Sequence, residues 1–150
     1  MDDILNDFSV FDSIDTQIMI SAKNAKVYVE KLDDKSASKF IDRVVSKYKL
    51  ESAYGFAWER LCRQIANGKL ECESIYGREI WDKLESMQLN NVIIFFDHFE
   101  CKSAYLFSNM QDLMRTLDPC DDFEFYLTNK NLDYIIAYTH CYYLYICKYK

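Results

Sequence analysis

The amino-acid sequence predicts an α+β fold in which a helical N-terminal half packs on a mostly antiparallel five-stranded sheet. Apolar residues recur every three or four positions over residues 15–87, and five short apolar and aromatic runs follow residue 91. The first spacing is that of amphipathic helices, and the second is typical of strands bounded by turn residues. Half of the 150 residues are hydrophobic, with one proline and three glycines. We therefore expect a single domain over residues 1–150, helical in 1–90 and sheet-forming in 91–150.

The N-terminal half predicts four helices. The second helix follows a possible N-cap at Ser36 or Ser38, and the third ends at Gly68, because glycine readily adopts the left-handed backbone that closes a helix. The fourth helix is expected over residues 75–87. The apolar residues that the pattern places on the four helices are, in order, Ile14, Ile18, Ala22, Ala25 and Val29; Phe40, Ile41, Val44, Val45 and Tyr48; Tyr54, Phe56, Ala57, Trp58, Leu61, Cys62 and Ile65; and Ile80, Trp81, Leu84 and Met87. In the third helix, Trp58 and the residues from Leu61 to Ile65 are expected to face the core.

The C-terminal part predicts the order strand, strand, helix, strand, strand, strand. The helix is expected over residues 109–117 and stops before Pro119. Most connections are too short for a crossover, so we expect mainly antiparallel pairing. The first run is apolar on both faces, which predicts a central strand. The five runs are residues 92–96, 104–107, 123–127, 134–138 and 142–146.

Charge and apolar pattern exclude several partners and locations. The chain carries 24 acidic and 18 basic residues, a formal net charge of -6. This balance argues against binding nucleic acid, whose affinity depends on clustered Lys and Arg. The N-terminus is acidic rather than basic, unlike a signal peptide, and no apolar run reaches the roughly 18 residues that a membrane span needs. We therefore expect a cytoplasmic protein without membrane contact.

The six cysteines are expected to be reduced thiols in the cytoplasm. No Cys-x-x-Cys pair suggests a redox motif or a zinc site. His98 and Cys101 could join His140 and Cys141 around zinc, but the last two are adjacent in a strand and their side chains point to opposite faces. No Lys or Arg lies within six residues of Cys141 to activate its thiol. We expect no metal, no cofactor and no thiol catalysis.

Catalysis by the two histidines is one alternative. His98 and His140 lie near predicted strand ends, where they could form a hydrolase or nuclease site with a carboxylate if they came within about 7 Å of one another. The sequence lacks a Gly-rich phosphate loop, a nucleophile elbow and an Asp-x-Asp cluster. We therefore expect that the protein is not an enzyme. A further alternative is a homodimeric structural or adaptor domain built by strand addition or helix packing.

An acidic loop over residues 118–124 is the main candidate for partner recognition. Acidic surfaces attract cationic partners and accelerate association. Tyrosines combine an apolar ring with a polar tip, so exposed tyrosines near this loop are expected to form the centre of an interface. The predicted partner-binding residues are Asp97, Glu100, Asp118, Asp121, Asp122, Glu124, Tyr126, Tyr138 and Tyr143.

Residues 123–140 comprise a Phe-x-Phe-Tyr strand, a polar turn at Asn129 and Lys130, and an aromatic strand ending at His140. This segment resembles the tail of small bacterial proteins in which the histidine is doubled; Cys141 occupies the second position here. In size, acidity and α+β pattern the chain resembles the immunity proteins of bacterial toxins, including those of contact-dependent growth inhibition systems. The resemblance implies a stoichiometric inhibitor, expected to be monomeric, that binds a basic toxin domain, often a cationic nuclease. It assigns no individual residue a role.

Overall fold

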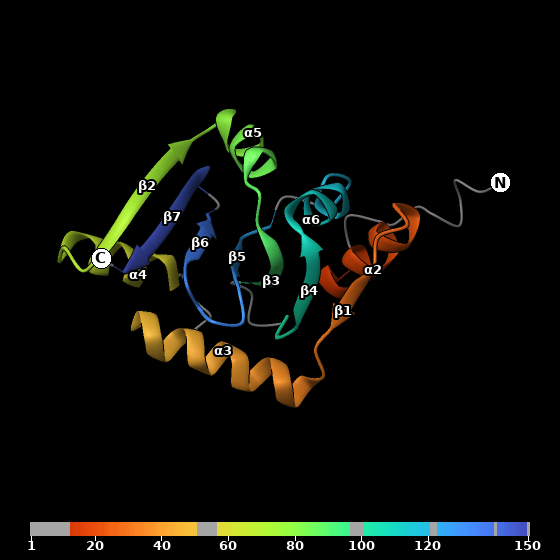
Figure 1. The fold of residues 1–150 in the computed structure, drawn as a ribbon, viewed down its shortest axis with the longest axis horizontal. Coiled ribbons are helices and arrows are strands. Elements are labelled where there is room, and N and C mark those ends of the chain that lie inside the picture. The colour runs from red at the N-terminus through yellow and green to blue at the C-terminus, as the bar shows by residue number, and fades with distance from the viewer. Residues whose placement is uncertain (1–12, 51–56, 97–100, 121–122, 140, 150) are drawn as a thin grey trace.

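The computed structural model describes residues 13–50, 57–96, 101–120, 123–139 and 141–149 (Figure 1). These residues form five helices and one seven-stranded antiparallel sheet of order β1-β4-β3-β5-β6-β7-β2. The α+β class is confirmed, whereas the expected number of five strands is wrong. The helices are α2 (Ile14–Asn24), α3 (Asp34–Tyr48), α4 (Ala57–Ala66), α5 (Glu79–Ser86) and α6 (Met110–Leu117). The strands are β1 (Val29–Lys31), β2 (Leu70–Tyr76), β3 (Asn90–Phe96), β4 (Ala104–Asn109), β5 (Phe125–Thr128), β6 (Ile135–Tyr138) and β7 (Tyr143–Tyr149).

The two additional strands lie in the half that was expected to be wholly helical, and they form the two edges of the sheet. β1 pairs with β4, and β2 pairs with β7 along its whole length. Val29 therefore belongs to β1, because α2 ends at Asn24 and Lys26 turns the chain with a φ of 56°. Ile75 belongs to β2 rather than to the fourth helix, since Gly77 with a φ of 75° separates that strand from α5.

Helices cover both faces of the sheet, in contrast to the single covered face expected from the sequence. α2, α5 and α6 lie on one face, and α3 and α4 lie on the other (Figure 1). β3 explains this arrangement, because its side chains alternate between two apolar cores. Val92, Ile94 and Phe96 pack against α2, α5 and α6. Ile93 and Phe95 pack against α3 and α4. The expectation that this strand is central is confirmed.

The C-terminal order of strands and helix is confirmed. α6 begins after Asn109, whose side chain accepts a hydrogen bond of 2.8 Å from the Asp112 backbone N–H. Gly68 has the left-handed conformation expected after the third helix. The N-cap of α3 is Asp33 rather than a serine, because its carboxylate accepts the Ser36 N–H at 2.8 Å. This hydrogen bond makes the largest contribution to lowering the pKa of the Asp33 carboxyl.

Tyr54, Phe56 and the side chain of Trp58, all predicted on the third helix, lie outside the described residues. Trp81 was expected in the core with Ile80 and Leu84, but its side chain is exposed. Ile80 and Leu84 are one helical turn apart and are both buried against the sheet, whereas position 81 points about 100° away from Ile80 and about 60° away from Leu84.

Asp15 joins α2 to the sheet. The buried Tyr105 hydroxyl in β4 donates a hydrogen bond to Asp15 Oδ1, and Lys31 Nζ in β1 lies 3.6 Å from the same oxygen. Burial and then the hydrogen bond to Asp15 raise the pKa of Tyr105, so its hydroxyl keeps the proton that it donates. A second link is the hydrogen bond of 2.5 Å from Ser21 Oγ to the Thr116 carbonyl, which connects α2 to α6.

We expect Tyr105→Phe to lower the free energy of unfolding by about 1.5 kcal/mol, because it removes a hydrogen bond to a charged group. The figure lies at the lower end of the usual range, since the Asp15 side chain is 34% exposed and water can replace the lost donor. Urea denaturation followed by circular dichroism measures the change. Tyr28→Phe is the control, because Tyr28 is 74% exposed and its replacement should change stability by less than about 0.5 kcal/mol. Equal urea midpoints for Tyr105→Phe and Tyr28→Phe would contradict the conclusion that the hydrogen bond to Asp15 stabilises the fold.

Candidate functional site

The helices α5 and α6 lie next to one another on the same face of the sheet and present polar side chains beside a tryptophan. Each helix buries one apolar stripe, Ile80 and Leu84 in α5 and Leu113 and Leu117 in α6. Trp81 lies off the buried stripe of α5 and is 40% exposed. The sequence of each helix thus determines both how the helix packs on the sheet and which of its side chains remain exposed to a partner.

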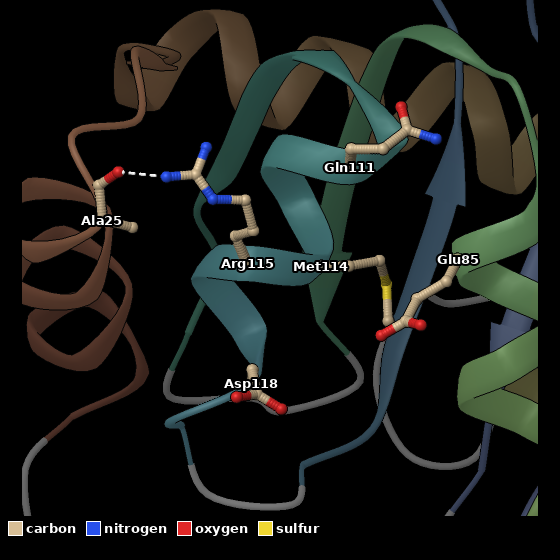
Figure 2. A pocket seen from close by; sticks show the side chains of 6 residues that line it. All are labelled: Ala25, Glu85, Gln111, Met114, Arg115 and Asp118. Atoms are coloured by element: carbon tan, nitrogen blue, oxygen red, sulfur yellow. Dashed lines mark hydrogen bonds between the residues drawn. The ribbon is translucent and has the colours of Figure 1, made fainter.

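The larger hollow at this surface has a volume of about 570 Å³. Figure 2 shows Met114 of α6 and Glu85 of α5 extending toward one another, while Arg115 points away toward α2. Arg115 is held there, because its guanidinium donates a hydrogen bond of 2.6 Å to the Ala25 carbonyl and lies 3.6 Å from Asp112 Oδ1. The hollow is lined by Ala25, Glu85, Gln111, Met114, Arg115 and Asp118.

A smaller hollow of about 170 Å³ adjoins the first and shares Asp118 with it. Its wall is aromatic. The ring of Trp81 stacks on Tyr138 with centroids 5.8 Å apart, and Tyr138 stacks in turn on Phe125 at 5.1 Å. Because Tyr138 and Phe125 belong to the inner strands β6 and β5, the exposed tryptophan rests on a buried part of the sheet. The lining residues are Trp81, Leu117, Asp118, Cys120, Phe123, Phe125 and Tyr138.

We call the surface formed by the two hollows the α5–α6 groove, defined by Trp81, Glu85, Gln111, Met114 and Asp118. Neither the Glu85 nor the Asp118 carboxylate has a hydrogen-bond or ion-pair partner in the part of the chain that the structure describes. Both side chains are exposed. An exposed indole ring beside two unpaired carboxylates can bind a Lys or Arg side chain, by cation–π contact and by ion pairing.

The structure brings two of the predicted partner-binding residues together. Asp118, at the C-terminal end of α6, is exposed and lines the small hollow with Tyr138. Glu124 is half-buried. Four of the predicted carboxylates, Asp97, Glu100, Asp121 and Asp122, lie outside the described residues. The acidic loop is therefore represented in the described site by its first residue.

The expectation that Tyr126 and Tyr138 are exposed is wrong. Tyr126 is 2% exposed and stacks on Phe95 at 5.2 Å, beneath α3, because β5 lies inside the sheet and both of its faces are covered. Tyr138 is 6% exposed, with Trp81 above it. Tyr143 is 39% exposed as expected, but it points to the other face of the sheet, where its ring contacts Tyr76 at 4.8 Å. These tyrosines do not form one surface.

His98 and His140, the two residues of the histidine alternative, both lie outside the described residues. Within the described ranges, no group of three or more His, Cys, Asp or Glu side chains could hold a metal ion. No helix in those ranges is long and apolar enough to span a bilayer.

Sequence reasoning missed Trp81 and Glu85 as site residues. A signal was present, because the two residues are four positions apart and therefore share one side of a helix. The apolar character of tryptophan favoured a place in the core instead. Its exposure depends on how α5 is rotated against the sheet, which a local pattern does not determine.

Comparison of the chain with protein-family models, with curated proteins and with solved structures finds no match in any of the three.

The stacked pair at the groove predicts unequal costs of truncation. We expect Tyr138→Ala to lower the free energy of unfolding by about 4 kcal/mol, because it removes a buried ring between Phe125 and Trp81. Trp81→Ala should cost only about 1–2 kcal/mol, since its ring is partly exposed and contributes mainly the stacking contact. Urea denaturation followed by far-ultraviolet circular dichroism measures both. A cost for Trp81→Ala as large as that for Tyr138→Ala would show that the tryptophan is a core residue rather than an available surface.

Proposed function

We propose that this chain is an immunity protein that binds a cognate bacterial toxin domain and neutralises it, with the α5–α6 groove as its contact surface. The observation that carries the proposal is the exposed Trp81 flanked by the unpaired carboxylates of Glu85 and Asp118. Tryptophan is among the residues that contribute most to binding energy at protein interfaces. A partner that covers this groove would bury the indole ring and pair both carboxylates.

The charge of the groove supports a basic partner. Arg115, the one cationic side chain among the lining residues that the structure describes, is already bound to Asp112 and to the Ala25 carbonyl. The whole chain has a formal net charge of -6, which accelerates association with a positively charged protein. A nuclease binds its substrate through Lys and Arg contacts to phosphates. An acidic groove complements such a surface. It would block the nuclease by pairing with the Lys and Arg side chains that otherwise contact phosphates.

The preformed geometry supports tight binding. Trp81 is stacked on Tyr138, and the backbone beneath it belongs to α5 and to the inner strand β6. A ring that is already oriented loses little conformational entropy when a partner covers it. The groove therefore presents the Trp81 ring in a fixed orientation before a partner arrives.

We expect the product of the neighbouring reading frame to inhibit growth when it is expressed alone, and co-expression of this chain to restore growth. The two purified proteins should form a 1:1 complex in size-exclusion chromatography with light scattering. A neighbouring product that neither inhibits growth nor binds this chain would contradict the proposed function.

The groove carboxylates can be tested separately in that complex. We expect the double variant Glu85→Gln, Asp118→Asn to weaken binding about 30-fold, corresponding to about 2 kcal/mol for two lost ion pairs. Glu79→Gln, Asp82→Asn is the matched control, because it removes the same charge from exposed positions of α5 outside the two hollows. Titration calorimetry at several salt concentrations compares them. Equal losses in both double variants would show that only overall charge matters, and the α5–α6 groove would then not be the interface.

A further inference from the structure

Two cysteines face each other across the pairing of β2 and β7. Cys72 and Cys147 are directly opposite in the antiparallel register, and their Sγ atoms are 3.1 Å apart. Opposed residues in antiparallel strands have Cβ atoms about 4.5–5.5 Å apart, and a disulfide needs Cβ atoms about 3.5–4.5 Å apart. The two sulfur atoms therefore have to approach one another by only about 1 Å to reach the bonding distance of about 2.05 Å. No rearrangement of the strand register is required.

We propose that Cys72 and Cys147 form a dithiol site that exchanges with small-molecule disulfides, such as oxidised glutathione, to form an intrachain disulfide between β2 and β7. This inference is independent of the α5–α6 groove, because the two cysteines belong to strands β2 and β7. It also goes beyond the expectation that all six cysteines are reduced thiols.

The surroundings assign different roles to the two thiols. Cys72 is half-buried, and the side chains of both cysteines point to the face of the sheet that α3 and α4 cover. Cys147 is 1% exposed, and burial raises the pKa of its thiol. A small disulfide therefore meets Cys72 first. β2 is an edge strand with a single neighbour, so the side chain of Cys72 can be approached without opening the centre of the sheet.

The exchange proceeds in two balanced steps. The Cys72 thiolate attacks one sulfur of oxidised glutathione, which forms a mixed disulfide and releases one glutathione thiolate. Cys147 then loses its proton and attacks Cys72 Sγ, which closes the protein disulfide and releases the second glutathione. The two protein thiols are oxidised, the glutathione disulfide is reduced to two thiols, and the protein loses two hydrogen atoms.

Cys62 of α4 is the competing partner. It is half-buried, burial raises the pKa of its thiol, and the charge of Cys72 contributes to the same shift, so this thiol lies in the same region. Cys62 is not in register with either strand residue, whereas Cys72 and Cys147 are held opposite one another by the β2–β7 ladder. The cross-strand pair is therefore the one that the fold preorganises.

The full-length chain with Cys141→Ser is the protein to test, because Cys141 is exposed and would form mixed disulfides of its own. The reduced protein is equilibrated with mixtures of reduced and oxidised glutathione, quenched with acid, denatured and alkylated. Mass spectrometry should show two fewer alkylated thiols at oxidising ratios, and a cross-linked peptide pair containing Cys72 and Cys147. The oxidised protein should remain a monomer and melt at a higher temperature than the reduced form, since the link spans 75 residues of sequence.

Three variants of the same protein decide the assignment. Cys72→Ser and Cys147→Ala should each abolish the loss of the two thiols, whereas Cys62→Ser should leave it unchanged. Circular dichroism verifies that each variant is folded, and Cys72→Ser, at a half-exposed position, keeps the test valid if Cys147→Ala does not fold. The proposal is overturned if the protein stays fully alkylated at every ratio, if the cross-link contains Cys62, or if Cys62→Ser prevents it.

Discussion

The rest of the structure depends on the burial of both faces of the inner strands. β3, β5 and β6 carry apolar side chains at consecutive positions, so water must be excluded from above and below them. Helices on a single face would leave Ile93, Phe95 and Ile135 exposed. α3 and α4 cover these residues, and α2, α5 and α6 cover the opposite side. The hydrophobic requirement of three short strands thereby determines where five helices lie.

This requirement also positions the groove. Ile80 and Leu84 hold α5 on the sheet, and Leu113 and Leu117 hold α6. The spacing of these buried residues determines which side chains of each helix face outward. Trp81 rests on Tyr138, whose own ring is part of the core between the helices and the sheet. An aromatic surface supported in this way is preorganised for a partner, because its orientation is fixed before contact. Packing that stabilises the fold thus also orients the candidate binding surface.

The sequence predicted those features that depend on local pattern. Residues 92–96 were recognisable as a central strand, because five consecutive apolar residues need two covered faces. The edge strands were not recognised. β1 has three residues, too few to show a period, and β2 is stabilised by pairing with β7 about 75 residues later. In the candidate site, Asp118 followed from the acidic composition of its loop, whereas the exposure of Trp81 depends on tertiary packing that no local pattern encodes.

The two groove carboxylates lie at positions that do not favour helix stability. Glu85 is in the last turn of α5, and Asp118 is the C-cap of α6, where the partial negative charge of the helix end opposes a carboxylate. Such an arrangement costs a few tenths of a kcal/mol at each exposed end, and no described cation offsets it at either residue. Lys83 and Arg115 lie at the same helix ends, where a positive charge is favourable. Lys83 pairs with Glu73 and Arg115 pairs with Asp112, so neither cation pairs with Glu85 or Asp118. A cation supplied by a partner would relieve both repulsions at once, so the electrostatic cost of the free protein becomes a gain in the complex.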